Sequence, residues 1–112
     1  MKKGEVWRVR LPLGAGHAQA GERPALIFQE GPFIAKLPTV LVIPFTSTMA
    51  ATRFAGTLVV QPDKQNGLTM PSVALVFQLS ALDKRECLMR LGILDQNTLD
   101  KIQTVLHQLT GR

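Results

Sequence analysis

The chain has 112 residues, of which 46% are hydrophobic, and this predicts one folded domain over residues 1–112 and excludes a disordered chain. Lys and Arg number 13 against 8 Asp and Glu, and the net charge of +5 favours a polyanionic partner such as nucleic acid or, alternatively, a basic solvated surface. The single cysteine excludes a disulfide framework within the chain, and no apolar run reaches the ~20 residues of a membrane helix. Because Met1-Lys2-Lys3 leads into no apolar signal segment, we expect a cytoplasmic protein without a membrane partner.

Short strands are predicted along most of the chain. Their residue ranges are 5–11, 23–29, 39–46, 56–61, 72–79 and 88–94, from alternating or continuous apolar residues. Loops or turns are expected at residues 13–22, 30–38, 47–53 and 63–67, and a short helical turn at 80–86. Trp7 is expected in the core, and Pro44 predicts an edge or a bulge at the end of its strand.

A helix is predicted to close the chain. Asp95 is a suitable N-cap, and Gly111 lies where a helix stop belongs. Between them, apolar residues recur at helical spacing, at Leu99, Ile102, Leu106 and Leu109. Five or six short strands followed by one helix predict a mostly β fold with some α, arranged as a small barrel or a curled sheet.

Two residues at strand ends are the leading candidates for chemistry. Pro24 restricts Arg23 to extended geometry at the start of the second strand, and Thr46 ends the third. If these strands are neighbours, a guanidinium and a hydroxyl could meet one phosphate at the same rim. An RNA substrate would supply its own nucleophile, the 2′-OH, so this route needs neither a metal nor another cofactor. Phosphate-loop, nucleophile-elbow and metal-ligand motifs are absent from the sequence.

Other polar residues are candidates for RNA binding. They are His17 and Gln19 in the first loop, Arg8 and Arg10 on one face of the first strand, Ser47 and Arg53 in the loop after Thr46, and Gln78 in a later strand. For each of them the alternative is an ordinary solvated or strand side chain. Arg23 could likewise be structural, holding a carboxylate at a strand start.

Several stretches in order resemble the successive motifs of the MazF/PemK toxins. They are residues 3–7 (KGEVW), 20–26 (AGERPAL) and 42–47 (VIPFTS), followed by 72–78 (SVALVFQ), 82–85 (LDKR), 90–92 (RLG) and the closing helix. Each motif alone is weak, whereas the ordered set covers nearly the whole chain. The resemblance implies an SH3-like β-barrel of the PemK type with a C-terminal helix, and a homodimer.

The resemblance also implies a function. Members are endoribonucleases that cut single-stranded RNA, often mRNA, at short sequences without a metal and leave a 2′,3′-cyclic phosphate. A cognate antitoxin holds them inactive, and contact with DNA would be only indirect, through that antitoxin. The family's catalytic arginine falls on Arg23 and its catalytic threonine on Thr46.

The sequence departs from the family pattern at two positions. Many members carry an acid about where this chain has Ala18, and an arginine where Ser80 follows Gln78-Leu79. These departures favour the alternative function, a non-catalytic SH3-like module that binds RNA or a partner peptide.

Overall fold

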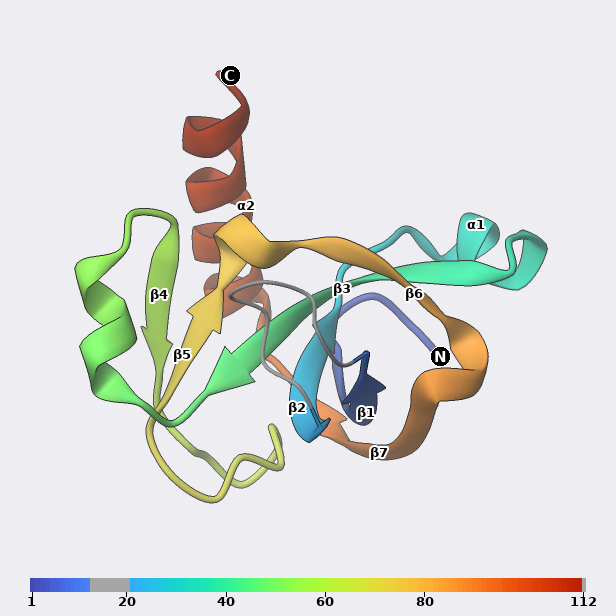
Figure 1. The fold of residues 1–112 in the computed structure, drawn as a ribbon, viewed down its shortest axis with the longest axis horizontal. Helices are drawn as coiled ribbons and strands as arrows, with labels where there is room; N and C mark the ends of the chain where they lie inside the picture. Colours follow the sequence, from blue (N-terminus) through green and yellow to red (C-terminus); the bar gives the residue numbers. More distant parts are fainter. Residues whose placement is uncertain (13–20, 112) are drawn as a thin grey trace.

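The computed structural model of the protein describes residues 1–12 and 21–111, and they form a curled antiparallel sheet with a C-terminal helix (Figure 1). The strands are β1 (Glu5–Leu11), β2 (Gly21–Ile27), β3 (Thr39–Thr46), β4 (Thr57–Val60), β5 (Ser72–Leu75), β6 (Ser80–Asp83) and β7 (Cys87–Ile93). The helices are α1 (Gly31–Lys36) and α2 (Gln96–Thr110), with 3-10 turns η1 (Met49–Arg53), η2 (Val76–Gln78) and η3 (Lys84–Glu86). Neither α-helix within this part of the chain has the length and apolarity needed to cross a membrane.

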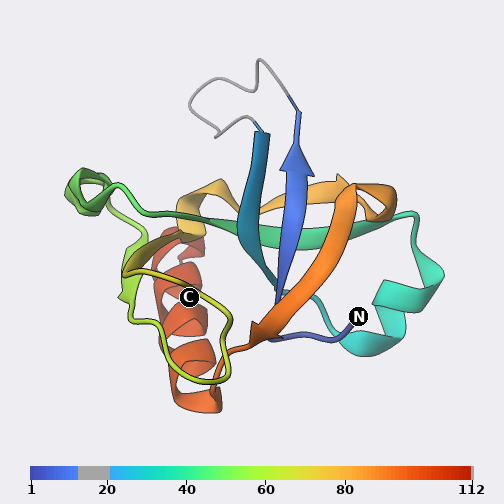
Figure 2. The ribbon, with the colours of Figure 1, turned by 90° about the horizontal axis from the view of Figure 1, so that it is seen from below.

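The sheet follows the order β4-β5-β3-β2-β1-β7, and β6 pairs separately with β3. The mostly β, barrel-like fold predicted from the sequence is therefore confirmed, although the two ends of the described sheet do not pair and the barrel is not closed. Figure 2 shows β2, β1 and β7 side by side, with β3 running across them. Because β3 crosses β2 steeply, the ladder between them is short, from Ile27–Val42 to Ala25–Pro44.

Strand β3 lies in the middle of the sheet, and the expectation of an edge at Pro44 was wrong. One side of β3 pairs with β2, and its other side changes partner along its length. Val42 pairs with Ser80 of β6, whereas Phe45 pairs with Ala74 of β5. Pro44 lies in the interval between the two partners, where a residue without an N–H is tolerated in a central strand.

Two apolar clusters cover the two faces of the sheet. The larger contains Val6, Leu26, Ile43, Phe45 and Ile102, with other residues of β4, β5 and α2. The smaller packs α1 against the opposite face and contains Val9, Leu11, Ala25, Ile27, Ile34, Val40, Val42 and Leu82. Both faces of β3 are buried, as its continuous apolar run predicted. Trp7 is only half-buried, at the margin of the smaller cluster.

Five predicted boundaries need correction. Residues 31–36 of the expected loop form α1, and residues 49–53 form η1, because single turns are too short to show a hydrophobic period. The strand predicted over 72–79 ends at Leu75 and continues as η2. The turn predicted over 80–86 is a strand, β6, followed by η3, since four residues gain strand geometry from pairing with β3. The second strand begins at Gly21, inside the predicted loop.

The closing helix agrees with the sequence. Asp95 caps its N-terminus by accepting a hydrogen bond from the Thr98 backbone N–H. Gly111 ends it with a φ of 85°, in the left-handed region that suits glycine. Ile102 is fully buried on its inner face, whereas Leu109 near the end is largely exposed.

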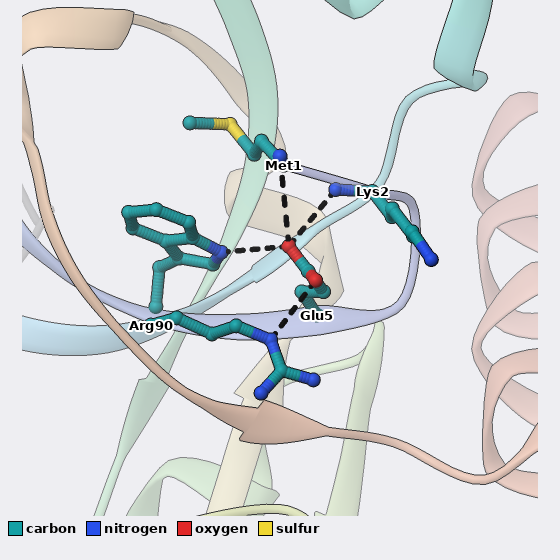
Figure 3. A network of polar contacts seen from close by, with 5 residues as sticks. Met1, Lys2, Glu5 and Arg90 are labelled. Atoms are coloured by element: carbon teal, nitrogen blue, oxygen red, sulfur yellow. Dashed lines mark hydrogen bonds and ion pairs between the residues drawn. The ribbon is translucent and has the colours of Figure 1, made fainter.

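A buried carboxylate ties the N-terminus to two strands of the sheet (Figure 3). Glu5 Oε1 accepts hydrogen bonds from the Lys2 backbone N–H at 2.9 Å and from Trp7 Nε1 at 3.0 Å. Arg90 Nε on β7 donates to Glu5 Oε2 at 2.9 Å, and the Met1 amino group lies 4.0 Å from Oε1. Burial alone would raise the pKa of Glu5, but the hydrogen bonds from Trp7, Lys2 and Arg90 together lower it below its ordinary value.

We expect Glu5→Gln to lower the free energy of unfolding by about 1–3 kcal/mol at pH 7, because an amide cannot accept from every donor around it. A lowered pKa in the folded state stabilises the protein above the unfolded pKa, and this stabilisation is lost as the pH falls through the folded value. Urea unfolding at several pH values measures the difference. The difference in unfolding free energy between the wild type and the variant should shrink in acid. An equal difference at every pH would show that it does not come from the ionised Glu5 carboxylate.

The turn at residues 63–67 is anchored by a buried amide. Asn66 is 1% exposed, its Nδ2 donates to Gln61 O, and its Oδ1 accepts from Leu68 N at 3.0 Å. The turn lies against β7, where Ile93 N donates to Gln65 O at 2.8 Å. Gly92 leaves the necessary space, since a Cβ there would lie 2.2 Å from Gln65 O.

We therefore expect Gly92→Ala to force the turn away from β7 and to destabilise the fold by about 1–3 kcal/mol. Gly31→Ala is the control, because nothing lies within 4 Å of a Cβ at that position. Thermal unfolding of both variants beside the wild type makes the comparison. Equal melting temperatures for Gly92→Ala and the wild type would show that the turn can move freely.

Candidate active site

The candidate site lies where β2 and β3 separate. The two strands pair as far as Ala25–Pro44. If the same register continued for two more residues, Arg23 would lie opposite Thr46. Beyond Ala25, β2 pairs only with β1, while the end of β3 turns to β5. The two candidate residues therefore flank an opening in the sheet, at the rim predicted from the sequence.

A pocket of about 290 Å³ occupies this opening. Its walls come from β1, β2, the end of β3 and the connection from β4 to β5. The lining residues are Arg8, Glu22, Arg23, Pro24, Phe45, Thr46, Ser47, Leu68, Thr69, Met70 and Ser72. Two guanidinium groups, one carboxylate and several hydroxyl groups thus surround a space large enough for a phosphate group.

Arg23 contributes a buried polar atom without a partner. Its Nε has no hydrogen-bond acceptor within residues 1–12 and 21–111, although a buried N–H is normally satisfied. Pro24 follows it and keeps its backbone extended in β2. A guanidinium held this way can donate to an anionic oxygen that enters the pocket.

Thr46 contributes a hydroxyl whose position is fixed. The residue is 3% exposed, and its Oγ1 accepts a hydrogen bond from the Thr48 backbone N–H at 3.2 Å. A hydroxyl that accepts through one lone pair can still donate its proton. Thr46 is thereby oriented by the turn that follows β3 and can donate into the pocket.

The structure brings together some of the predicted RNA-binding residues and separates others. Arg8 and Ser47 line the pocket with Arg23 and Thr46. The other candidates within the described residues are not among the lining residues. Arg10 Nη1 lies 3.8 Å from Glu86 Oε2, and Arg53 Cζ lies 4.9 Å from the centroid of the Phe54 ring. Gln78 is the last residue of η2. His17, Gln19 and the departure at Ala18 fall outside the described residues.

One wall of the pocket and one of its charged groups were not predicted from the sequence. Residues 68–70 and Ser72 reach the pocket from the connection after β4, which the anchored turn at residues 63–67 holds against β7. Glu22 precedes Arg23 on β2 and is the carboxylate among the described lining residues. Sequence spacing could not predict the wall, because it lies more than twenty residues after Thr46. The position of Glu22 directly before Arg23 could have indicated the carboxylate.

In the two described ranges of the chain, no three His, Cys, Asp or Glu side chains gather closely enough to hold a metal ion. The chemistry that the pocket itself displays is that of cationic and hydroxyl donors facing an anion.

Comparison with known proteins agrees with the fold. A profile of the PemK-like, MazF-like toxins of type II toxin–antitoxin systems matches residues 2–110. Endoribonuclease EndoA of Bacillus subtilis is 28% identical over 96% of this chain and 91% of its own. Endoribonuclease PemK of Escherichia coli is 43% identical over 50% of this chain, and the match spans only 42% of PemK.

Solved structures share the fold. MazF of Deinococcus radiodurans superposes with a TM-score of 0.83 at 22% identity, covering 100% of this chain and 97% of that one. An endoribonuclease in complex with its cognate antitoxin, from a mycobacterial species, superposes with a TM-score of 0.77 at 22% identity. The match covers 99% of this chain and 95% of that one. The curled sheet with its closing helix is therefore an established architecture.

Proposed function

Since the chain belongs to the family of PemK-like, MazF-like toxins of type II toxin–antitoxin systems, we propose that it is an endoribonuclease acting at the pocket of Arg23 and Thr46. The observation that carries this proposal is the buried Nε of Arg23, which has no acceptor among the described residues and shares its pocket with a fixed threonine hydroxyl. The family membership and the endoribonuclease relatives favour this function over a non-catalytic RNA- or peptide-binding module.

The proposed reaction is cleavage of single-stranded RNA by its own ribose. The 2′-oxygen attacks the neighbouring phosphorus, the bond from phosphorus to the 5′-oxygen breaks, and a 2′,3′-cyclic phosphate and a 5′-hydroxyl result. Arg23 donates to the phosphoryl oxygens and stabilises the extra negative charge of the pentavalent phosphate. Thr46 donates a hydrogen bond to the same phosphate and holds it in line with the attacking oxygen. These groups act without a metal.

The other cations would bind the rest of the RNA strand. Arg8 lines the pocket and would contact a phosphate next to the cleaved one. Arg10 and Arg53 lie outside it and would contact more distant phosphates, with Gln78 as a polar contact on the same path. Ser47 would donate beside Thr46, and His17 and Gln19 would approach the RNA from the first loop.

The proposal includes protein partners. Structural relatives are described as bound to a cognate antitoxin or to MazE, which supports an antitoxin as the partner that inhibits this chain. We propose a homodimer, an mRNA substrate cut at a short sequence, and contact with DNA only through the antitoxin. This activity would be that of an mRNA interferase in the cytoplasm.

The decisive experiment incubates the purified protein, free of antitoxin, with mixed RNA in EDTA. Cleavage that leaves cyclic-phosphate ends is expected. For Arg23→Ala we expect at least a 10²–10³-fold loss in the rate constant at saturating RNA, the usual effect of removing a donor from a developing oxyanion. Folded wild-type protein that leaves varied RNA sequences intact would contradict the proposed function; equal RNA binding by both proteins without cleavage would favour the module.

Thr46→Val tests the hydroxyl at nearly constant volume. We expect the cleavage rate to fall about 10²-fold, because the donor to the phosphate is lost. Thr46→Ser is the matched control, since it keeps the hydroxyl, and it should retain most of the activity. Thermal unfolding must accompany the rates, because the Thr48 N–H also loses its acceptor in Thr46→Val. Equal activity of the valine and serine variants would remove Thr46 from the mechanism.

Arg8→Ala tests a binding role. The affinity for uncleavable RNA, made with all 2′-hydroxyls methylated, should fall, and the slope of log K against log salt should flatten by about 1. Lys101→Ala changes the charge equally on α2, outside the pocket, and is the control. If both variants change the slope alike, Arg8 acts only through the net charge of the protein.

A further inference from the structure

Glu22 is an unexplained charge in the pocket. It extends from β2 beside Arg23, lies opposite Arg10 of β1 in the strand register, and lines the same pocket as Arg8 and Thr46. The side chain is exposed and forms no hydrogen bond or ion pair within the described residues, although Arg8 and Arg23 line the same pocket and Arg10 lies opposite it. It is therefore not used to neutralise a structural arginine.

A carboxylate is an unfavourable group in a site that only binds phosphate. At a separation of a few ångströms it repels the phosphate charge, and an ionised carboxylate has no proton with which to donate a hydrogen bond. A passive anion site would be stronger without it. What an ionised carboxylate can do is accept a proton from a hydroxyl that approaches it.

We propose that Glu22 is a catalytic residue that accepts the proton of the attacking ribose 2′-OH. The assignment rests on the proposed function of the pocket. The O–H electron pair forms the new bond to phosphorus, the proton passes to the Glu22 carboxylate, and the bond to the 5′-oxygen breaks. The 5′-oxygen leaves with the electron pair of the broken bond to phosphorus and takes a proton from water. Glu22 returns its proton to the solvent, so no proton is gained or lost overall.

The charged groups around Glu22 agree with this role. Arg8 and Arg10 face it from β1, and Arg23 adjoins it on β2. The end of β3 contributes Phe45, Thr46 and Ser47, and the wall after β4 contributes Leu68, Thr69, Met70 and Ser72, none of which is charged. Among the described residues, the charged groups that line the pocket with Glu22 are therefore the guanidinium groups of Arg8 and Arg23, and Arg10 opposite it also lies 3.8 Å from Glu86 (Nη1 to Oε2).

Glu22→Gln tests the assignment, with Glu30→Gln as the matched control. Glu30 is exposed and pairs with Lys3 away from the pocket, so its variant removes the same charge without touching the site. For Glu22→Gln we expect the cleavage rate at saturating RNA to fall by about 10²-fold or more, the usual contribution of a general base. Its affinity for fully 2′-O-methylated RNA should stay equal or increase. The wild-type rate should fall in acid, and that fall should be absent from the residual activity of the variant.

Three outcomes would overturn the proposal. If Glu22→Gln cleaves like the wild type while Arg23→Ala does not, the proposed function stands and Glu22 has no catalytic part. If the glutamine variant loses affinity for the methylated RNA but keeps its saturated rate, Glu22 binds substrate instead of moving a proton. If the wild type cleaves no RNA, the proposed function fails first, and the role of Glu22 falls with it.

Discussion

The site depends on the way β3 crosses β2. Because the strands meet at a steep angle, their recorded ladder ends at Ala25–Pro44, although both strands continue. Among the described residues, those beyond that pair have a strand neighbour on one side only, β1 for β2 and β5 for β3. An uninterrupted ladder would close the gap. The gap holds a pocket lined by Arg23, whose buried Nε has no hydrogen-bond acceptor within residues 1–12 and 21–111.

A second constraint fixes the wall opposite the arginine. The connection from β4 to β5 has no strand partner over residues 68–70, so something else must hold it. Buried Asn66 forms hydrogen bonds within the turn. Because Gly92 has no side chain, Gln65 O can approach it closely and the turn packs against β7. Strand β7 also contacts the N-terminus through Arg90 and Glu5. Contacts made by the turn and β7 therefore hold the segment that forms one wall of the pocket.

The sequence predicted the features that local chemistry decides. The alternation in β1, the continuous apolar run of β3 and the caps of α2 each depend on neighbouring residues, and each was correct. The strand β6 and the helix α1 were missed because their geometry comes from distant partners. Strand β6 pairs with β3 about forty residues earlier, and Lys84 Nζ donates to Ile34 O within α1 at 2.8 Å.

The same division applies to the site. Arg23 and Thr46 could be placed at one rim from sequence because each ends or begins a strand, and the strands are consecutive. The wall from residues 68–72 could not, since nothing in its own sequence indicates what it faces. The separation of Arg8 from Arg10 was also hidden: both share one face of β1, yet only Arg8 reaches the pocket, while Arg10 lies near Glu86.

The pleat of β2 explains why neighbours of opposite charge can serve one pocket. Successive side chains of a strand point to opposite faces, so in a continuous sheet Glu22 and Arg23 would lie on different sides. Here β2 has no strand neighbour toward β3 among the described residues, and both side chains line the pocket in the gap. A proton acceptor and a charge-stabilising donor can then approach one phosphodiester from two directions. A metal-free transesterification needs that geometry, because the attacking hydroxyl and the developing phosphoryl charge occupy different positions.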